Sequence, residues 1–225
     1  MARKLSSMAI LRSLMVAFSS ATAEDLFDLR FKPEPASAVP VRVLIVYHSE
    51  TGYTRTLAQA IRAGASSGGA DVRLLSCKNA TYKNDVLWAD AIVVGSPTHY
   101  GNPSADILGW FEKEWEDGFY DRRLDGKLGA AFATGGGMNQ GVEHVVTGLQ
   151  RALESFRLRY IAPDPSRNGY HSYGGVAITG TEPFNLTAPQ ISEQFLQPGK
   201  DLGAKVASAA ASTIRAKTAS AAHEL

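Results

Sequence analysis

The 225-residue chain has the length and composition of one globular domain with some additional chain. Hydrophobic residues make up 44% of it, charged residues 20%, and the formal net charge is +1 at pH 7. Basic residues do not cluster with aromatic ones, so the sequence gives no support for nucleic-acid binding. Cys77 is the only cysteine, which excludes an intramolecular disulfide and a multi-cysteine metal site. We expect it to be an inert, half-buried thiol.

The first 23 residues resemble a targeting segment that is removed. They hold three basic residues and no acid, an apolar stretch at 14–18, and small residues at 21–23 before the first acid, Glu24. This signal-peptide pattern predicts entry into the secretory pathway; a mitochondrial or a cytoplasmic location is the alternative. Residues 24–40 hold three prolines and no periodic pattern, and they are expected to form an extended lead-in.

The rest of the chain alternates apolar runs of strand length with helical patterns. Val41 to Tyr47 is almost continuously β-branched and aliphatic, as a strand covered on both faces requires. This alternation predicts an α/β fold of three layers, a five-stranded parallel sheet with helices on both faces, over residues 41–217, followed by a tail at 218–225. Further strands are expected at 71–75, 89–95 and 129–134 and, as one interrupted strand, at 159–162 and 176–179. Helices are expected from Thr54 to 64–69, around 107–111, at 142–156 and at 190–217.

In such folds a ligand binds beyond the carboxyl ends of the strands, where strand order reverses. The loop after the first strand is polar and leads directly into a helix, whose N-terminus attracts anions. Its hydroxyl groups and its glycine suit a phosphate group, although a simple helix cap explains them equally well. It has no lysine, which excludes an ATP-type P-loop. The residues of this loop expected to bind the ligand are Ser49, Glu50, Thr51, Gly52, Tyr53 and Thr54.

The loop after the third strand, from Ser96 to Asn102, combines a proline, an aromatic residue and a glycine. Tyr100 offers a face for stacking on a planar ligand, and Gly101 lets the backbone approach it. The alternatives are a tyrosine that packs on the edge of the domain and an idle loop histidine at position 99. The residues expected to contact the ligand are Pro97, Thr98, His99, Tyr100, Gly101 and Asn102.

The loop after the fourth strand has hardly any side chains at its apex. Its three consecutive glycines cost backbone entropy, so a ligand that needs close approach of backbone amides explains them better than a flexible connector does. The residues expected there are Thr134, Gly135, Gly136, Gly137, Met138 and Gly141.

Two segments carry a resemblance to a known family. Residues 43–61 (VLIVYHSETGYTRTLAQAI) resemble the phosphate-binding segment of flavodoxins, whose loop reads Ser/Thr-x-Thr-Gly-x-Thr. Residues 89–102 (ADAIVVGSPTHYGN), followed by 131–141, are more similar to the WrbA-like NAD(P)H:quinone oxidoreductases. The resemblance extends over about 41–180.

The resemblance implies a flavodoxin-like fold that binds FMN, with the phosphate on the first loop and the flavin ring between the other two. It implies hydride transfer from NADH or NADPH to FMN and two-electron transfer to a quinone. It also implies a homo-oligomer, dimer or tetramer, in which Tyr173 lines the flavin of a neighbouring subunit. His99, Tyr100 and Tyr173 are candidate pocket residues, and no metal is expected.

The chain also departs from the quinone reductases. They carry polar residues at Gly135, Gly137 and Met138, and a histidine where this chain has Gln150. Two other functions therefore stay open. One is a one-electron carrier like the flavodoxins, which are strongly acidic, whereas residues 24–225 hold 20 basic and 22 acidic side chains. The other is a flavin-binding scaffold without turnover.

Overall fold

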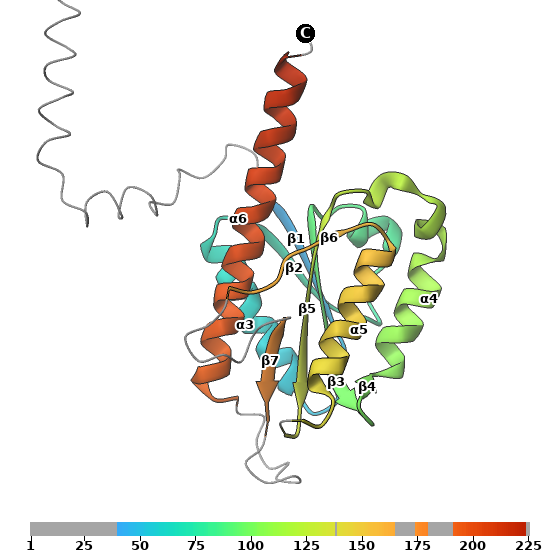
Figure 1. The fold of residues 1–225 in the computed structure, drawn as a ribbon, viewed down its shortest axis with the longest axis vertical. Helices are drawn as coiled ribbons and strands as arrows, with labels where there is room; N and C mark the ends of the chain where they lie inside the picture. The colour runs from blue at the N-terminus through green and yellow to red at the C-terminus, as the bar shows by residue number, and fades with distance from the viewer. Residues whose placement is uncertain (1–39, 138, 165–173, 180–190, 224–225) are drawn as a thin grey trace, which may run out of the picture. The chain divides into compact units, whose positions relative to one another are not determined.

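The structure, a computed structural model, describes residues 40–137, 139–164, 174–179 and 191–223. Strands and helices alternate along the chain, and the sheet has helices on both faces (Figure 1). The predicted three-layer α/β fold is confirmed. The strands are β1 (Arg42–Tyr47), β2 (Asp71–Ser76), β3 (Ala91–His99), β4 (Asn102–Pro103), β5 (Leu128–Gly135), β6 (Arg159–Tyr160) and β7 (Gly175–Ile178). The helices are α3 (Tyr53–Ser67), α4 (Ala105–Tyr120), α5 (Val142–Ser155) and α6 (Glu193–His223), with the short η1 (Tyr82–Val86) and η2 (Arg122–Leu124).

The main sheet runs in the order β2-β1-β3-β5-β6, and these neighbours are all parallel. This is the strand order of flavodoxin-like folds, in which order reverses between β1 and β3. The fifth position is shared by two strands, because β6 pairs with the first residues of β5 and β7 with its last ones. The interrupted fifth strand of the sequence prediction therefore consists of two separate strands in one position of the sheet.

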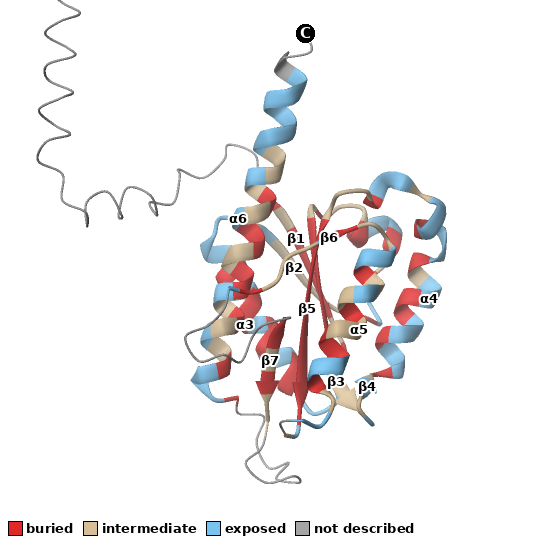
Figure 2. Cartoon of the chain, viewed as in Figure 1, coloured by how far each residue is buried: buried red, intermediate tan, exposed pale blue. Residues whose placement is uncertain are grey.

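Figure 2 shows that the central strands are buried along most of their length, and their alternate residues belong to two separate cores. On β1, Leu44 and Val46 pack with α4 and α5, whereas Val43 and Ile45 pack with α3 and α6. A strand buried on both faces needs apolar residues at every position, which is why the run from 41 to 47 shows no polar alternation.

Helices α3 and α6 approach each other through glycines. A Cβ atom on Gly203 would lie 2.0 Å from the carbonyl oxygen of Ile61, and one on Gly64 would lie 1.8 Å from that of Lys200. Backbone contact of this kind leaves no room for any side chain at the crossing. It fixes α6 against α3, and α3 begins at the predicted phosphate loop.

Two parts of the chain differ from the sequence prediction. Residues 82–86 form a short π-helix, η1, and the side chain of Thr81 at its start accepts a hydrogen bond from the backbone N–H of Asn84. Helix α6 continues to His223, whereas we expected it to end at Lys217. The alanines of that last segment favour helix, so the helix continues where its residues are exposed. In the described part of the chain, no helix combines the length and apolarity needed to cross a membrane.

An ion pair joins the starts of β1 and β3. The guanidinium of Arg42 donates to both carboxylate oxygens of Asp90, at 3.2 Å from Nε and 3.0 Å from NH2, and its backbone N–H donates at 2.9 Å. Burial alone would raise the pKa of Asp90, but the hydrogen bonds from Arg42 outweigh it and leave the pKa below its ordinary value.

Replacing Asp90 with Asn should therefore lower the free energy of unfolding at pH 7 by about 1 kcal/mol, a modest loss because Arg42 is half-exposed. The pKa is lowered on folding, so the stabilisation is complete above the unfolded-state value near 4 and is lost as the pH falls through the lower folded-state value. Urea unfolding at pH 7 and at pH 3 measures this. Asp117→Asn, at an exposed site on α4, is the control; an Asp90→Asn deficit that persists unchanged at pH 3 contradicts the assignment.

Candidate active site

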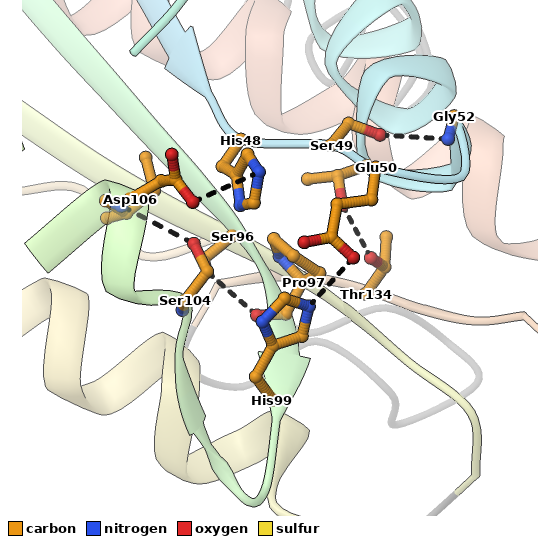
Figure 3. A network of polar contacts seen from close by, with 12 residues as sticks. His48, Ser49, Glu50, Gly52, Ser96, Pro97, His99, Ser104, Asp106 and Thr134 are labelled. Atoms are coloured by element: carbon orange, nitrogen blue, oxygen red, sulfur yellow. Dashed lines mark hydrogen bonds and ion pairs between the residues drawn. The ribbon is translucent and has the colours of Figure 1, made fainter. Parts of the chain in front are cut away.

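The carboxyl ends of β1, β3 and β5 bring the three predicted loops together. These strands are neighbours in register, with Tyr47 beside Gly95 and Pro97 beside Thr134. The first loop leads into α3, the second turns back into β4, and the third leads into α5. Figure 3 shows that side chains from all three loops lie within one region.

The first loop ends in an uncapped helix. Gly52 precedes α3 with φ 98°, in the left-handed region that favours glycine, and at this N-cap position the structure has no side-chain cap hydrogen bond among the described residues. The hydroxyl of Ser49 accepts a hydrogen bond from the Gly52 N–H at 3.1 Å, which closes the turn, and the hydroxyl proton of Ser49 stays available as a donor. The capping alternative for Ser49 and Thr51 is thus not what the structure has. The positive end of the α3 dipole faces an exposed loop.

Two predicted residues of this loop point inward. The ring of Tyr53 is buried in the core between the sheet and helices α3 and α6, so only its backbone faces the loop. The hydroxyl of Thr54 is buried and lies 2.8 Å from that of Thr134 at the end of β5. In this pair one hydroxyl donates and the other accepts, so one proton is left over for a further acceptor. The pair joins the first loop to the third.

The second loop is a hairpin, and our prediction that all of 96–102 is irregular was wrong. Strand β3 continues to His99, and β4 pairs back onto it in antiparallel register, with His99 opposite Asn102. Tyr100 and Gly101 form the turn, with φ 51° and 78°. Two positive φ values in a two-residue turn define type I′, for which glycine is the usual second residue.

Tyr100 is strained and fully exposed. Left-handed backbone costs a residue with a Cβ about 1–2 kcal/mol, and here a hydrogen bond from Asn102 Nδ2 to the Tyr100 carbonyl, at 3.0 Å, holds it. The ring has 103% relative exposure, so no described residue covers it. Strain and exposure of an aromatic residue at one turn are typical of a ligand-contact position, since packing does not account for them.

The third loop touches the second through glycines. Gly141, at φ 92°, precedes α5 without a side-chain cap, and a Cβ there would lie 2.5 Å from the Cα of Gly101. Gly135 faces the Thr98 hydroxyl, since its Cβ would lie 3.3 Å from Oγ1. A second helix N-terminus therefore opens onto the same region. Met138 and Tyr173 lie outside the described residues.

A histidine that the sequence analysis did not single out lies beneath this region. His48 is buried at the end of β1, with Nε2 3.6 Å from Oδ2 of Asp106 at the start of α4. Within the described residues, its Nδ1 has no hydrogen-bond partner, and neither has the buried Oγ1 of Thr98. A polar residue directly after an apolar strand was the signal that could have identified His48. Two buried polar atoms without a described partner, at the carboxyl ends of β1 and β3, are consistent with a binding site there.

Cys77 is not a candidate nucleophile. Burial raises the pKa of its thiol, and the nearby carboxylate of Asp106 raises it further. A thiol held in its protonated form is a poor nucleophile. This supports the expectation of an inert cysteine, although the side chain is more fully buried than half.

Comparison with known proteins identifies the family. The flavodoxin family model matches residues 45–158, slightly more than half of the chain. The chain belongs to the flavodoxin family. A flavodoxin of Aquifex aeolicus is 37% identical over 119 residues, which are 51% of this chain and 61% of that protein. An Archaeoglobus fulgidus protein named NAD(P)H dehydrogenase (quinone) is 29% identical over 198 residues, which are 75% of this chain and 97% of that protein.

Solved structures agree on the fold. A WrbA-like flavodoxin protein from Agrobacterium tumefaciens superposes with a TM-score of 0.60 at 22% identity, over 76% of this chain and 97% of that one. An archaeal flavodoxin gives a TM-score of 0.56 over 76% and 99%. At these identities the likeness shows the flavodoxin-like fold, which the family resemblance of the sequence implied.

The contact between the loops gives a direct test. Gly141→Ala in the flavodoxin-family chain combines a strained φ with a clash against the Gly101 backbone and should lower the free energy of unfolding by about 2 kcal/mol. Gly148→Ala, inside α5 where a Cβ meets only Pro103 at 3.7 Å, should be neutral or slightly stabilising. Chemical denaturation of both variants measures this. Equal stability of the two would show that the loops do not meet at these glycines.

Proposed function

We propose that this chain is an FMN-dependent oxidoreductase that passes two electrons from NADH or NADPH to a quinone or a similar acceptor. The observation that carries the proposal is the uncapped N-terminus of α3 behind the left-handed Gly52, in a loop rich in hydroxyl groups. An anion is the group that such a helix end lacks. Assembly into dimers or tetramers is part of the same proposal.

The first loop fits the phosphate of FMN. The Ser49 hydroxyl keeps its proton while it accepts from Gly52, and the Thr54–Thr134 pair has one proton to spare. Thr51 is exposed on the same turn. These neutral donors, together with the helix dipole, would hold a phosphate without a lysine.

The second and third loops fit the flavin ring. Tyr100 is exposed, the buried hydroxyl of Thr98 has no partner among the described residues, and the glycines at 135–137 allow close backbone approach. When bound, FMN would supply the hydride-accepting and electron-transferring chemistry. The contribution of the chain is to orient the ring, to exclude water from one side of it, and to shape the acceptor slot with Tyr100.

The comparisons support the enzyme more than the carrier. The quinone dehydrogenase relative aligns over 97% of its length, whereas the Aquifex flavodoxin aligns over 61% of its own. The formal charge of +1 also lacks the strong acidity that steers flavodoxins to basic redox partners. The higher identity to the Aquifex protein favours a one-electron carrier as the second candidate.

Anaerobic mixing with NADH or NADPH distinguishes the proposed enzyme from a one-electron carrier. We expect the FMN-loaded protein to lose its yellow absorbance with NADH or NADPH at about 1 per second or faster, a typical enzymatic rate, and to regain it when a quinone is added. A carrier would keep its colour on the same timescale. Tight FMN binding with no bleaching by either nicotinamide contradicts the enzyme and favours the carrier or a scaffold.

The Tyr100→Ala variant should slow bleaching while it retains FMN.

A further inference from the structure

A line of charged and titratable side chains crosses the carboxyl ends of β1 and β3 (Figure 3). At one end, Glu50 of the first loop lies 4.0 Å from Nε2 of His99, Oε2 to nitrogen. The rings of His99 and His48 meet edge to face, with centroids 6.1 Å apart. At the other end, Asp106 lies between His48 and Lys78, 3.6 Å from a nitrogen of each.

The negative charge of Glu50 opposes the anion binding that we propose for its loop. The helix end and the hydroxyl groups around it favour an anion, yet Glu50 places a carboxylate in the middle of the turn between Ser49 and Gly52. A carboxylate beside a phosphate raises the free energy of the bound state through like-charge repulsion. A positive partner for Glu50 removes that repulsion.

His99 is the positive partner that the structure offers. Its side chain is about one-third exposed, and Glu50 faces it from the first loop while His48 faces it from the end of β1. Asp106 of α4 and Lys78 after β2 lie behind His48 and pair with each other. Among the described residues, the partner of Glu50 is thus an imidazole, which is positive only when it is protonated.

We propose that His99 and Glu50 form a proton-dependent clasp that controls how tightly the first loop binds a phosphomonoester. This inference rests on the proposed function and concerns regulation of the same site. With His99 protonated, the Glu50 charge is compensated, the β3–β4 hairpin is held on the first loop, and phosphate binds well. With His99 neutral, Glu50 repels the phosphate.

The sign of the linkage follows from the charges. A bound phosphate stabilises the protonated imidazole, so binding takes up a proton, and the affinity is high at low pH and falls as the pH rises. The second ionisation of a phosphomonoester near pH 6 acts in the opposite direction, because the dianion is the better ligand for a helix end. Comparison of the wild type with variants at His99 and Glu50 distinguishes protonation of the protein from ionisation of the phosphate, because the phosphate ionises in the same way whichever variant it is mixed with.

The test is FMN binding, followed by quenching of flavin fluorescence, at pH 6 and at pH 8.5. Relative to wild type, His99→Gln should bind about tenfold more weakly at pH 6 and equally at pH 8.5, the effect of one charge at close range. Glu50→Gln should bind equally at pH 6 and about tenfold more tightly at pH 8.5. In the double variant, which lacks both charged groups, the FMN affinity should no longer change with pH through the clasp. The matched control is His144→Gln, at an exposed site on α5.

Riboflavin, which lacks the phosphate, provides the second arm. It should show no difference between wild type and His99→Gln at either pH. If wild type and His99→Gln change in parallel from pH 6 to pH 8.5, or if riboflavin responds as FMN does, the clasp is overturned while the proposed function stands. If wild type binds FMN at neither pH, the proposed function fails and the clasp fails with it. Thermal unfolding of each variant shows that it is folded.

Discussion

The positive end of helix α3 is the feature on which the site depends. Parallel pairing places the ends of β1 and β3 side by side, and Gly52, which has no side chain of its own to cap the helix, turns the chain from β1 into α3. A helix N-terminus at the point where strand order reverses creates a position for an anion. The sheet and the α3–α6 contact fix where that position lies.

The other loops are tied to this helix end by short contacts. Thr54 reaches Thr134 on β5, Gly101 touches Gly141, and the hairpin turn at Tyr100 extends outward between them. Buried hydroxyls and glycine backbone contacts allow little variation in distance. A planar ligand anchored at α3 would therefore meet Tyr100 and the glycines of the third loop in a defined orientation.

The sequence predicted the three layers, the parallel sheet and the positions of the three loops, because buried parallel strands appear in a sequence as unbroken apolar runs. It did not predict that β3 continues to His99, since the type I′ turn has tyrosine where asparagine or aspartate is the usual signal. It also did not predict that tertiary contacts bury the side chains of Tyr53 and Thr54, two residues that it assigned to the ligand. The position of His48, a polar residue directly after an apolar strand, was a signal in the sequence, but its contacts with Asp106 and His99 join residues that are distant in sequence and could not be predicted.

The measurement that tests the account most directly is the ratio of the affinities for FMN and for riboflavin, determined by titration of the wild-type chain at neutral pH. If a phosphate on the α3 N-terminus anchors the ligand, FMN should bind about 100-fold more tightly or better, because two or more charge-assisted hydrogen bonds are lost without it. Equal affinities would contradict the phosphate site, and with it the orientation of every other group.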